Sequence, residues 1–196
     1  MLIIEGSDLV GKTTLIKRVS KELDALGYPV IYQHFGLLPK DWNYYSDYIK
    51  FMNRRVIMDR FIMSEVVYGT VVRNKSKISP AAYRLLDAHL RLYAATTVVI
   101  TTSKAWLEKQ IKEKYGDRYE AFSKETILKV NTGFNDLFRG GLLDGNDMFI
   151  CDYDIRYDMD VDDTMPAENN KLVATILNTY ICKIQILKQL TDIKEI

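Results

Sequence analysis

The residues whose types and spacing are best suited to chemistry lie near the N-terminus, in the stretch E-G-S-D-L-V-G-K-T-T. The spacing of Gly6, Gly11, Lys12 and Thr13 satisfies G-x-x-x-x-G-K-[ST], in which backbone N–H groups cradle phosphates, the lysine reaches the β- and γ-phosphates and the hydroxyl binds Mg²⁺. The alternative is a glycine turn between a strand and a helix, with an exposed lysine. The stretch predicts a triphosphate-binding loop formed by Gly6, Ser7, Asp8, Val10, Gly11, Lys12, Thr13 and Thr14.

A second pair of candidate catalytic residues, Asp59 and Arg60, ends the apolar run R-V-I-M-D. Asp59 is suited to hold the water shell of a metal ion, together with Thr13, or to act as a general base. The planar guanidinium of Arg60 suits a phosphate. The alternative is a structural ion pair between the two residues. Asp8, inside the loop, is expected to face a sugar hydroxyl or a cation's water shell, or else solvent.

Five further residues are candidates for contact with an acceptor. Glu65, Tyr68 and Arg73 follow the Asp59-Arg60 pair on a predicted helix, where Tyr68 could stack on a base or belong to the core. His34 and Phe35 follow the second apolar run. His34 could face the acceptor, act as its base if the acceptor is a hydroxyl, or be a packed loop residue.

Short apolar runs alternate with longer amphipathic patterns along the chain, which is typical of a parallel sheet covered on both faces. This alternation predicts an α/β fold, a doubly wound three-layer sandwich with a five-stranded parallel sheet and ligands at the carboxyl ends of the strands. The expected strands are residues 2–5, 29–33, 55–59, 96–102 and 147–152. Ser79 before Pro80 is expected to start one of the predicted helices. The expected helices are residues 12–27, 41–52, 62–72, 80–94, 104–115, 123–138 and 167–190.

Composition favours one globular domain over residues 1–196, with 47% hydrophobic residues. With 27 basic and 26 acidic residues, the chain has no excess charge that would indicate a long nucleic-acid surface. Two cysteines and two histidines argue against a disulfide framework or a zinc site. The start M-L-I-I-E-G lacks a basic leader, and no segment approaches the roughly 20 apolar residues of a membrane span. We therefore expect no membrane association and a cytoplasmic location.

Together, the loop motif, the D-R-F of residues 59–61 and the S-E-V-V-Y-G of residues 64–69 resemble the thymidylate kinases and their deoxynucleoside-kinase relatives. Residues 112–137 are similar to the lid of thymidylate kinases and the helix that follows it, with D-R-x-E at residues 117–120. The resemblance implies the P-loop nucleoside triphosphate hydrolase fold of nucleotide kinases. It also implies a single kinase domain with a lid-like segment at about residues 112–122.

The resemblance also implies roles for individual residues. In that family the aspartate matching Asp8 approaches the deoxyribose 3′-hydroxyl, and the arginine matching Arg60 holds the acceptor phosphate. Lid arginines stabilise the transferring phosphoryl group, which makes Arg118 the leading candidate here. Arg156 follows the fifth predicted strand, where related kinases hold adenine.

The chain departs from thymidylate kinases after the second predicted strand. They carry an Arg-Glu-Pro-Gly stretch there, whereas this chain reads Q-H-F-G-L-L-P-K-D-W at residues 33–42 and reaches the third strand after about twenty residues. This compact layout looks more like kinases encoded by bacteriophages, some of which act on modified pyrimidines. For a phage-encoded protein the expected location is the host cytoplasm.

The sequence therefore predicts an ATP- and Mg²⁺-dependent kinase that phosphorylates a deoxynucleoside monophosphate. One alternative is a hydroxyl acceptor, either a deoxynucleoside or a hydroxymethylated pyrimidine such as 5-hydroxymethyluracil in DNA, which would make DNA a partner. Another is a nucleotide-binding switch without an acceptor. The last predicted helix closes the sheet or forms the face of a homodimer.

Overall fold

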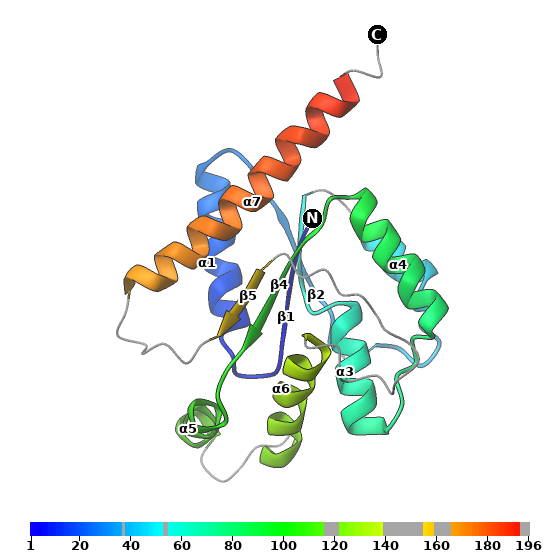
Figure 1. Ribbon diagram of the computed structural model, residues 1–196, viewed down its shortest axis with the longest axis vertical. Coiled ribbons are helices and arrows are strands. Elements are labelled where there is room, and N and C mark those ends of the chain that lie inside the picture. The colour runs from blue at the N-terminus through cyan, green and yellow to red at the C-terminus, as the bar shows by residue number, and fades with distance from the viewer. Residues whose placement is uncertain (37, 53–54, 116–121, 139–154, 159–165, 193–196) are drawn as a thin grey trace.

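The computed structural model describes residues 1–36, 38–52, 55–115, 122–138, 155–158 and 166–192. Its strands form one sheet in the order β2-β3-β1-β4-β5, and every pairing is parallel (Figure 1). The strands are β1 (Leu2–Gly6), β2 (Ile31–His34), β3 (Val56–Asp59), β4 (Thr96–Thr101) and β5 (Ile155–Asp158). Because all strands run in one direction, their carboxyl ends meet at one edge of the sheet.

Helices cover both faces of this sheet, as the continuous apolar runs of β1, β3 and β4 require. Ile3 packs into one core with α2, α3, α4 and α6, and Ile4 packs into a second core with α1, α5 and α7. The α/β class and the parallel sheet are thereby confirmed. The helices are α1 (Lys12–Ala25), α2 (Ser46–Phe51), α3 (Ile62–Arg73), α4 (Pro80–Leu92), α5 (Lys104–Tyr115), α6 (Lys124–Phe138) and α7 (Pro166–Asp192).

Most predicted helices begin and end within a few residues of their observed bounds. The start of α4 is confirmed, because the Ser79 hydroxyl accepts a hydrogen bond from the Ala82 amide and Pro80 opens the helix. The prediction for residues 41–52 was too long at its start. Asn43 accepts from the amides of Tyr45 and Ser46, and this local turn delays α2 to Ser46.

Two predictions concern segments that lie partly or wholly outside the described residues. The strand expected at residues 147–152 lies outside them, and β5 at Ile155–Asp158 takes the place beside β4. Of the expected lid, residues 112–115 belong to α5, Phe122 precedes α6 and residues 116–121 lie outside the description.

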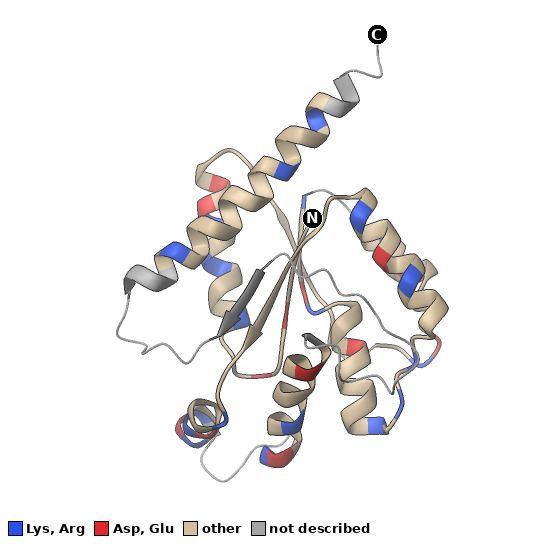
Figure 2. Cartoon of the chain, viewed as in Figure 1, with Lys and Arg blue, Asp and Glu red and all other residues tan. Residues whose placement is uncertain are grey.

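The last helix, α7, packs on α1 and β4, so the prediction that it closes one face of the sheet is confirmed. Its C-terminal part extends beyond the sheet (Figure 1). A homodimer through this helix stays a prediction. No helix in the described ranges combines the length and apolarity that crossing a bilayer requires. Basic and acidic residues both occur along α4 and α6 (Figure 2).

Gly6 is the glycine that the fold can least replace. Its φ is 144°, and a Cβ atom there would lie 2.5 Å from the Ile100 carbonyl oxygen on the neighbouring strand. We expect Gly6→Ala to lower the free energy of unfolding by at least about 2 kcal/mol, because backbone strain and a backbone clash add. Gly27→Ala is the control: φ is 80° but nothing lies within 4 Å, so only about 1 kcal/mol should be lost. Urea unfolding checks both, and equal losses would contradict the clash.

Candidate active site

The loop between β1 and α1 has the backbone geometry that phosphate binding requires. Gly6, Leu9 and Gly11 have φ values of 144°, 69° and 85°, which turn the chain sharply between strand and helix. The Leu15 amide donates to the Gly11 carbonyl and begins α1, and the N-cap residue Gly11 has no side chain to cap this helix start. The first amides of α1 are therefore left to an anion, at the positive end of the helix dipole.

Lys12 is buried at this helix start, and its Nζ donates to the Ser7 carbonyl across the loop. Burial lowers the pKa of Lys12 to about 8, and the charge of Arg60 acts in the same direction. The carboxylates of Asp8, Asp59 and Glu5 act in the opposite direction. The exposed-lysine alternative is thus wrong, and the ammonium lies where phosphates of a bound nucleotide would restore its charge.

Asp8, Arg60 and Tyr68 form one connected group at the mouth of the loop. Arg60 pairs with Asp8, and its guanidinium carbon lies 4.9 Å from the centroid of the Tyr68 ring. The Tyr68 hydroxyl donates to Asp8 Oδ2 at 3.0 Å. Arg60 has a φ of 67°, a conformation that non-glycine residues seldom adopt and that directs its side chain toward the loop. The loop aspartate is thereby fixed to the end of β3 and to α3.

Asp59 and His34 end neighbouring strands and contact each other. Nδ1 of His34 lies 3.0 Å from Asp59 Oδ2, and the same oxygen accepts from the Tyr32 hydroxyl at 3.0 Å. Burial, followed by the hydrogen bond to Asp59, raises the pKa of Tyr32 to about 12, so this hydroxyl remains a donor. The predicted alternative for Asp59 and Arg60 was a mutual ion pair, but their carboxylate and guanidinium bind His34 and Asp8 respectively.

Glu65 and Arg73, both predicted to contact an acceptor, form an ion pair. Glu65 also accepts from the Lys77 amide at 3.0 Å, so it holds the turn that follows α3. Gly69 makes room for the pair, because a Cβ atom there would lie 2.8 Å from Arg73 Nη2 and from the Ser76 Cα. The pair fixes the C-terminal end of α3.

Phe35, a predicted substrate contact, is a core residue. The residue is 6% exposed, and its ring has edge contacts with Trp42, Tyr48 and Phe51 at centroid distances of 5.2 to 6.2 Å. The side chain of Val10, from the predicted nucleotide loop, is fully buried in the other core. A contact of Val10 with nucleotide would therefore come from its backbone.

The sequence interpretation missed the role of Glu5, which is fully buried at the end of β1. One oxygen of Glu5 accepts from the amides of Phe61 (2.9 Å), Met63 (3.2 Å) and Ser64 (3.4 Å), and the other accepts from the Ser64 hydroxyl. Burial raises the pKa of Glu5 to about 7, while these hydrogen bonds act to lower it. Glu5 therefore caps α3 from β1, although α3 follows β3 in the chain. The available signal was a single acid within an apolar run.

Asn131 on α6 was also missed. Its side-chain amide donates to the Thr102 carbonyl at 2.7 Å, and its oxygen lies 3.4 Å from the Ser7 hydroxyl that donates to it. The residue is 4% exposed, so these contacts connect α6 and the end of β4 with the phosphate loop. An asparagine within a helical pattern carries no sequence signal for such a contact.

Two predicted residues receive no side-chain description. Arg118 lies outside the described residues, and Arg156 is placed only by its backbone, which pairs in register with Val99 of β4. Thr13 and Thr14 lie in the first turn of α1.

The predicted metal ligands are Thr13 and Asp59. Asp59 Oδ1 is buried and, within the described part of the chain, has no hydrogen-bond partner, so it retains a free acceptor. The described residues contain no cluster of three acidic, histidine or cysteine ligands. Mg²⁺ in kinase sites is commonly held by one or two protein oxygens plus phosphates and waters, and the residues present fit that arrangement.

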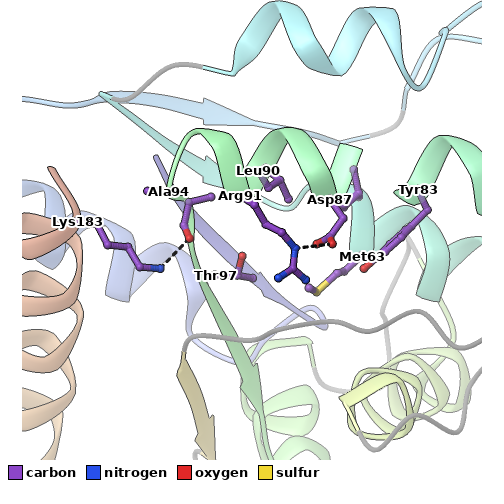
Figure 3. A pocket seen from close by; sticks show the side chains of 10 residues that line it. Met63, Tyr83, Asp87, Leu90, Arg91, Ala94, Thr97 and Lys183 are labelled. Carbon is purple, nitrogen blue, oxygen red and sulfur yellow. Dashed lines mark hydrogen bonds and ion pairs between the residues drawn. The ribbon is translucent and has the colours of Figure 1, made fainter. Parts of the chain in front are cut away.

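A pocket of about 320 Å³ lies away from the phosphate loop, between α3, α4, α7 and the start of β4. None of the residues that the sequence predicted for the site lines it. Its basic side chains are engaged, since Arg91 pairs with Asp87 and Lys183 donates to the Ala95 carbonyl (Figure 3). We therefore assign the candidate active site to the carboxyl edge of the sheet.

Comparison with known proteins bears on the fold. The chain is 27% identical over 134 residues, 66% of this chain and 78% of the relative, to the SPbeta prophage-derived uncharacterized protein YorR of Bacillus subtilis strain 168. The crystal structure of YorR in complex with phosphorylated GDP aligns with a TM-score of 0.63 at 19% identity, over 96% of this chain and 97% of YorR. No protein-family model matches the chain.

A second structure, assigned as polyphosphate kinase 2 from Pseudomonas aeruginosa, aligns with a TM-score of 0.60 at 18% identity. It covers 94% of this chain, which in turn spans 42% of that protein. The chain has a P-loop kinase-like fold. At these identities the P-loop kinase-like fold is what the structures share, and thymidylate kinase activity stays a prediction. The prophage origin of YorR is consistent with the predicted likeness to bacteriophage-encoded kinases.

The lowered pKa of Lys12 predicts that nucleotide binding takes up a proton. At about pH 9 the free protein has a mostly neutral Lys12, because its pKa is about 8. Bound phosphates raise this pKa toward its ordinary value, so Lys12 gains a proton on binding and affinity falls as pH rises from about 8. Calorimetry with an unreactive ATP analogue, in two buffers of different ionisation enthalpy, measures this uptake. Lys12→Met is the control without an ionisable group, and zero uptake by the unmodified protein would contradict the prediction.

Proposed function

We propose that this protein is an ATP- and Mg²⁺-dependent kinase that transfers the γ-phosphoryl group to a nucleoside- or nucleotide-type acceptor. The observation that carries the proposal is the phosphate loop itself. It combines the open helix start, the buried Lys12 and the turn at Gly6 and Gly11 in the geometry that a triphosphate needs. A fold of the P-loop kinase type supports the same conclusion.

In this proposal the donor site consists of residues 6–14. Backbone amides of the loop and of the first turn of α1 bind the β- and γ-phosphates, and Lys12 neutralises the charge that develops during transfer. Thr13 and Asp59 would hold Mg²⁺, which supplies further charge neutralisation at the phosphates. Arg118 is proposed to close over the transferring group, as the resemblance to thymidylate kinases implies.

The acceptor site is proposed to lie beside Asp8, Arg60 and Tyr68. A deoxynucleoside monophosphate, the acceptor expected from the sequence, would place its phosphate at Arg60 and its sugar hydroxyl at Asp8. Because Arg60 and Asp8 pair with each other, both groups must exchange partners when such an acceptor binds. A hydroxyl acceptor is the second candidate, and it would leave this pair intact.

A nucleotide-binding switch without an acceptor is the rival from another class. Such a switch does not need the His34–Asp59 contact or the acidic and basic groups gathered at the ends of β2 and β3. These groups favour transfer to an acceptor over slow hydrolysis.

The principal test is Lys12→Ala in an assay of ATP consumption with deoxynucleoside monophosphates, deoxynucleosides and DNA that contains 5-hydroxymethyluracil. We expect turnover to fall by at least about 100-fold, because the variant loses charge stabilisation in the transition state. Circular dichroism should show an unchanged fold. Lys17→Ala, an exposed lysine on the same helix, is the control and should keep full activity. Undiminished turnover of Lys12→Ala would remove this residue from the mechanism.

Arg60→Ala tests the acceptor clamp. If Arg60 holds an acceptor phosphate, the variant should raise the KM for monophosphates by about 10-fold or more, with the KM for ATP unchanged. Initial-rate kinetics with each substrate varied in turn provide both constants. An unchanged KM for every monophosphate would exclude Arg60 as the clamp and favour the hydroxyl acceptor.

A further inference from the structure

We infer that Asn131 on α6 is a positioning residue of the donor site. It holds Ser7 of the phosphate loop, and through the Ser7 carbonyl it fixes the place of the Lys12 ammonium. The inference rests on the kinase function proposed above, because the group that this loop and lysine would bind is the triphosphate of ATP. It extends the donor site to a helix that follows β4, 124 residues along the chain from Ser7.

The hydrogen bonds of Asn131 determine which end of its carboxamide faces the loop. The side-chain nitrogen donates to the Thr102 carbonyl at 2.7 Å. A carbonyl oxygen can only accept, so the nitrogen must face Thr102 and the side-chain oxygen must face Ser7. Asn131 therefore offers the loop an acceptor, and the Ser7 hydroxyl donates to it.

Burial makes this contact one that the protein has to satisfy from within. Asn131 and Ser7 are both buried, so neither polar side chain can turn to bulk water. The Ser7 hydroxyl has one hydrogen and two acceptors, Asn131 Oδ1 at 3.4 Å and the Asp8 carbonyl at 3.2 Å. Sharing one hydrogen explains why both distances exceed the usual O–H···O distance of about 2.7 Å. The hydroxyl is thus held between α6 and the backbone of the loop itself.

The carbonyl of the same serine holds the candidate catalytic lysine. Lys12 Nζ donates to the Ser7 carbonyl, and Lys12 is itself buried. An ammonium group has three hydrogens, so Nζ can keep this bond and still donate to two phosphate oxygens. The direction of the Ser7 carbonyl therefore sets where the charge of Lys12 lies relative to a bound triphosphate. Asn131 acts on the transferring group through Ser7 and Lys12.

The strand behind the loop leaves Ser7 little freedom to move. Gly6 pairs in register with Ile100 of β4, and a Cβ atom on Gly6 would lie 2.5 Å from the Ile100 carbonyl oxygen. Two residues after Ile100, Thr102 provides the carbonyl that anchors Asn131. The loop is therefore attached to the end of β4 twice, by direct packing at Gly6 and through Asn131 at Ser7.

The helix that carries Asn131 is itself fixed beside α3 (Figure 1). Phe134, one turn after Asn131, is buried in the core that α3 also lines. The centroid of its ring lies 6.5 Å from that of Tyr68, whose hydroxyl donates to Asp8 Oδ2. The helix α6 thus supports two successive loop residues, Ser7 directly and Asp8 through Tyr68. Such a support keeps the loop preorganised, as charge stabilisation during transfer requires.

The test is a double-mutant cycle on nucleotide binding. Asn131→Ala, Ser7→Ala and the variant with both changes are titrated with an unreactive ATP analogue and Mg²⁺ in a calorimeter. We expect each single change to weaken binding by about 10-fold, because the lysine loses its preorganised position. The double change should weaken binding by the same factor, since both changes remove one contact. Thr132→Ala, at the exposed next position of α6, is the control and should bind like the unmodified protein.

Kinetics separate positioning from a general effect on the fold. Initial rates are measured with ATP varied, at a saturating concentration of the acceptor that supports the highest rate. Asn131→Ala should lower kcat/KM for ATP by about 10-fold or more, whereas KM for that acceptor should stay unchanged. Urea unfolding without nucleotide measures the stability of each variant. If Asn131→Ala does not fold, Asn131→Leu fills the side-chain volume without hydrogen-bonding groups and should show the same losses.

Unchanged affinity and kcat/KM for ATP in a folded Asn131 variant would overturn the inference and leave Asn131 as a structural link between α6 and the end of β4. Losses that multiply in the double variant would also overturn it, because Asn131 would then not act through Ser7. If the unmodified protein binds the analogue but phosphorylates no acceptor, the proposed kinase function fails while the binding cycle still decides the role of Asn131. An unmodified protein that binds no ATP analogue would refute the donor site itself.

Discussion

Two carboxylates, Glu5 just before Gly6 and Asp8 inside the phosphate loop, connect this loop to the rest of the molecule. Glu5 receives the first amides of α3, and Asp8 receives Arg60 from the end of β3 and the hydroxyl of Tyr68 from α3. A short segment at the exit of β1 thus fixes the start of α3 and the end of β3 together. These contacts hold the groups that would meet a donor and an acceptor in one rigid arrangement, which preorganised electrostatic catalysis requires.

The site is close to charge balance before any ligand binds. Lys12 and Arg60 lie among Glu5, Asp8 and Asp59, and these three carboxylates act to raise the pKa of Lys12 whereas Arg60 acts to lower it. A triphosphate shifts this balance strongly toward negative charge, so a divalent cation and a protonated Lys12 are the natural complement. An uncharged acceptor would add no further negative charge for the site to neutralise.

Local sequence patterns predicted the features that depend on residues close together in the chain. The phosphate loop, the Ser79-Pro80 helix start and the continuous apolar strands follow from spacing, capping and burial on both faces, which the sequence states directly. The role of Glu5 and of Asn131 could not be read in this way, because their partners lie 56 to 59 and 124 residues away in the chain. Only the strand order brings such groups together, and pattern analysis does not supply the pairing of particular side chains. The motifs also did not indicate that the side chains of Phe35 and Val10 belong to the two cores.

The strand order has a consequence for how specificity can change. Within the described sheet β2 has a neighbour on one side only, whereas β1 is enclosed between β3 and β4. In the proposed function the donor loop follows the enclosed strand β1, whereas the predicted substrate residue His34 ends the peripheral strand β2, and β3 lies between them. Changes in β2 and in the residues that follow it would therefore leave the phosphate loop and both strands beside β1 in place.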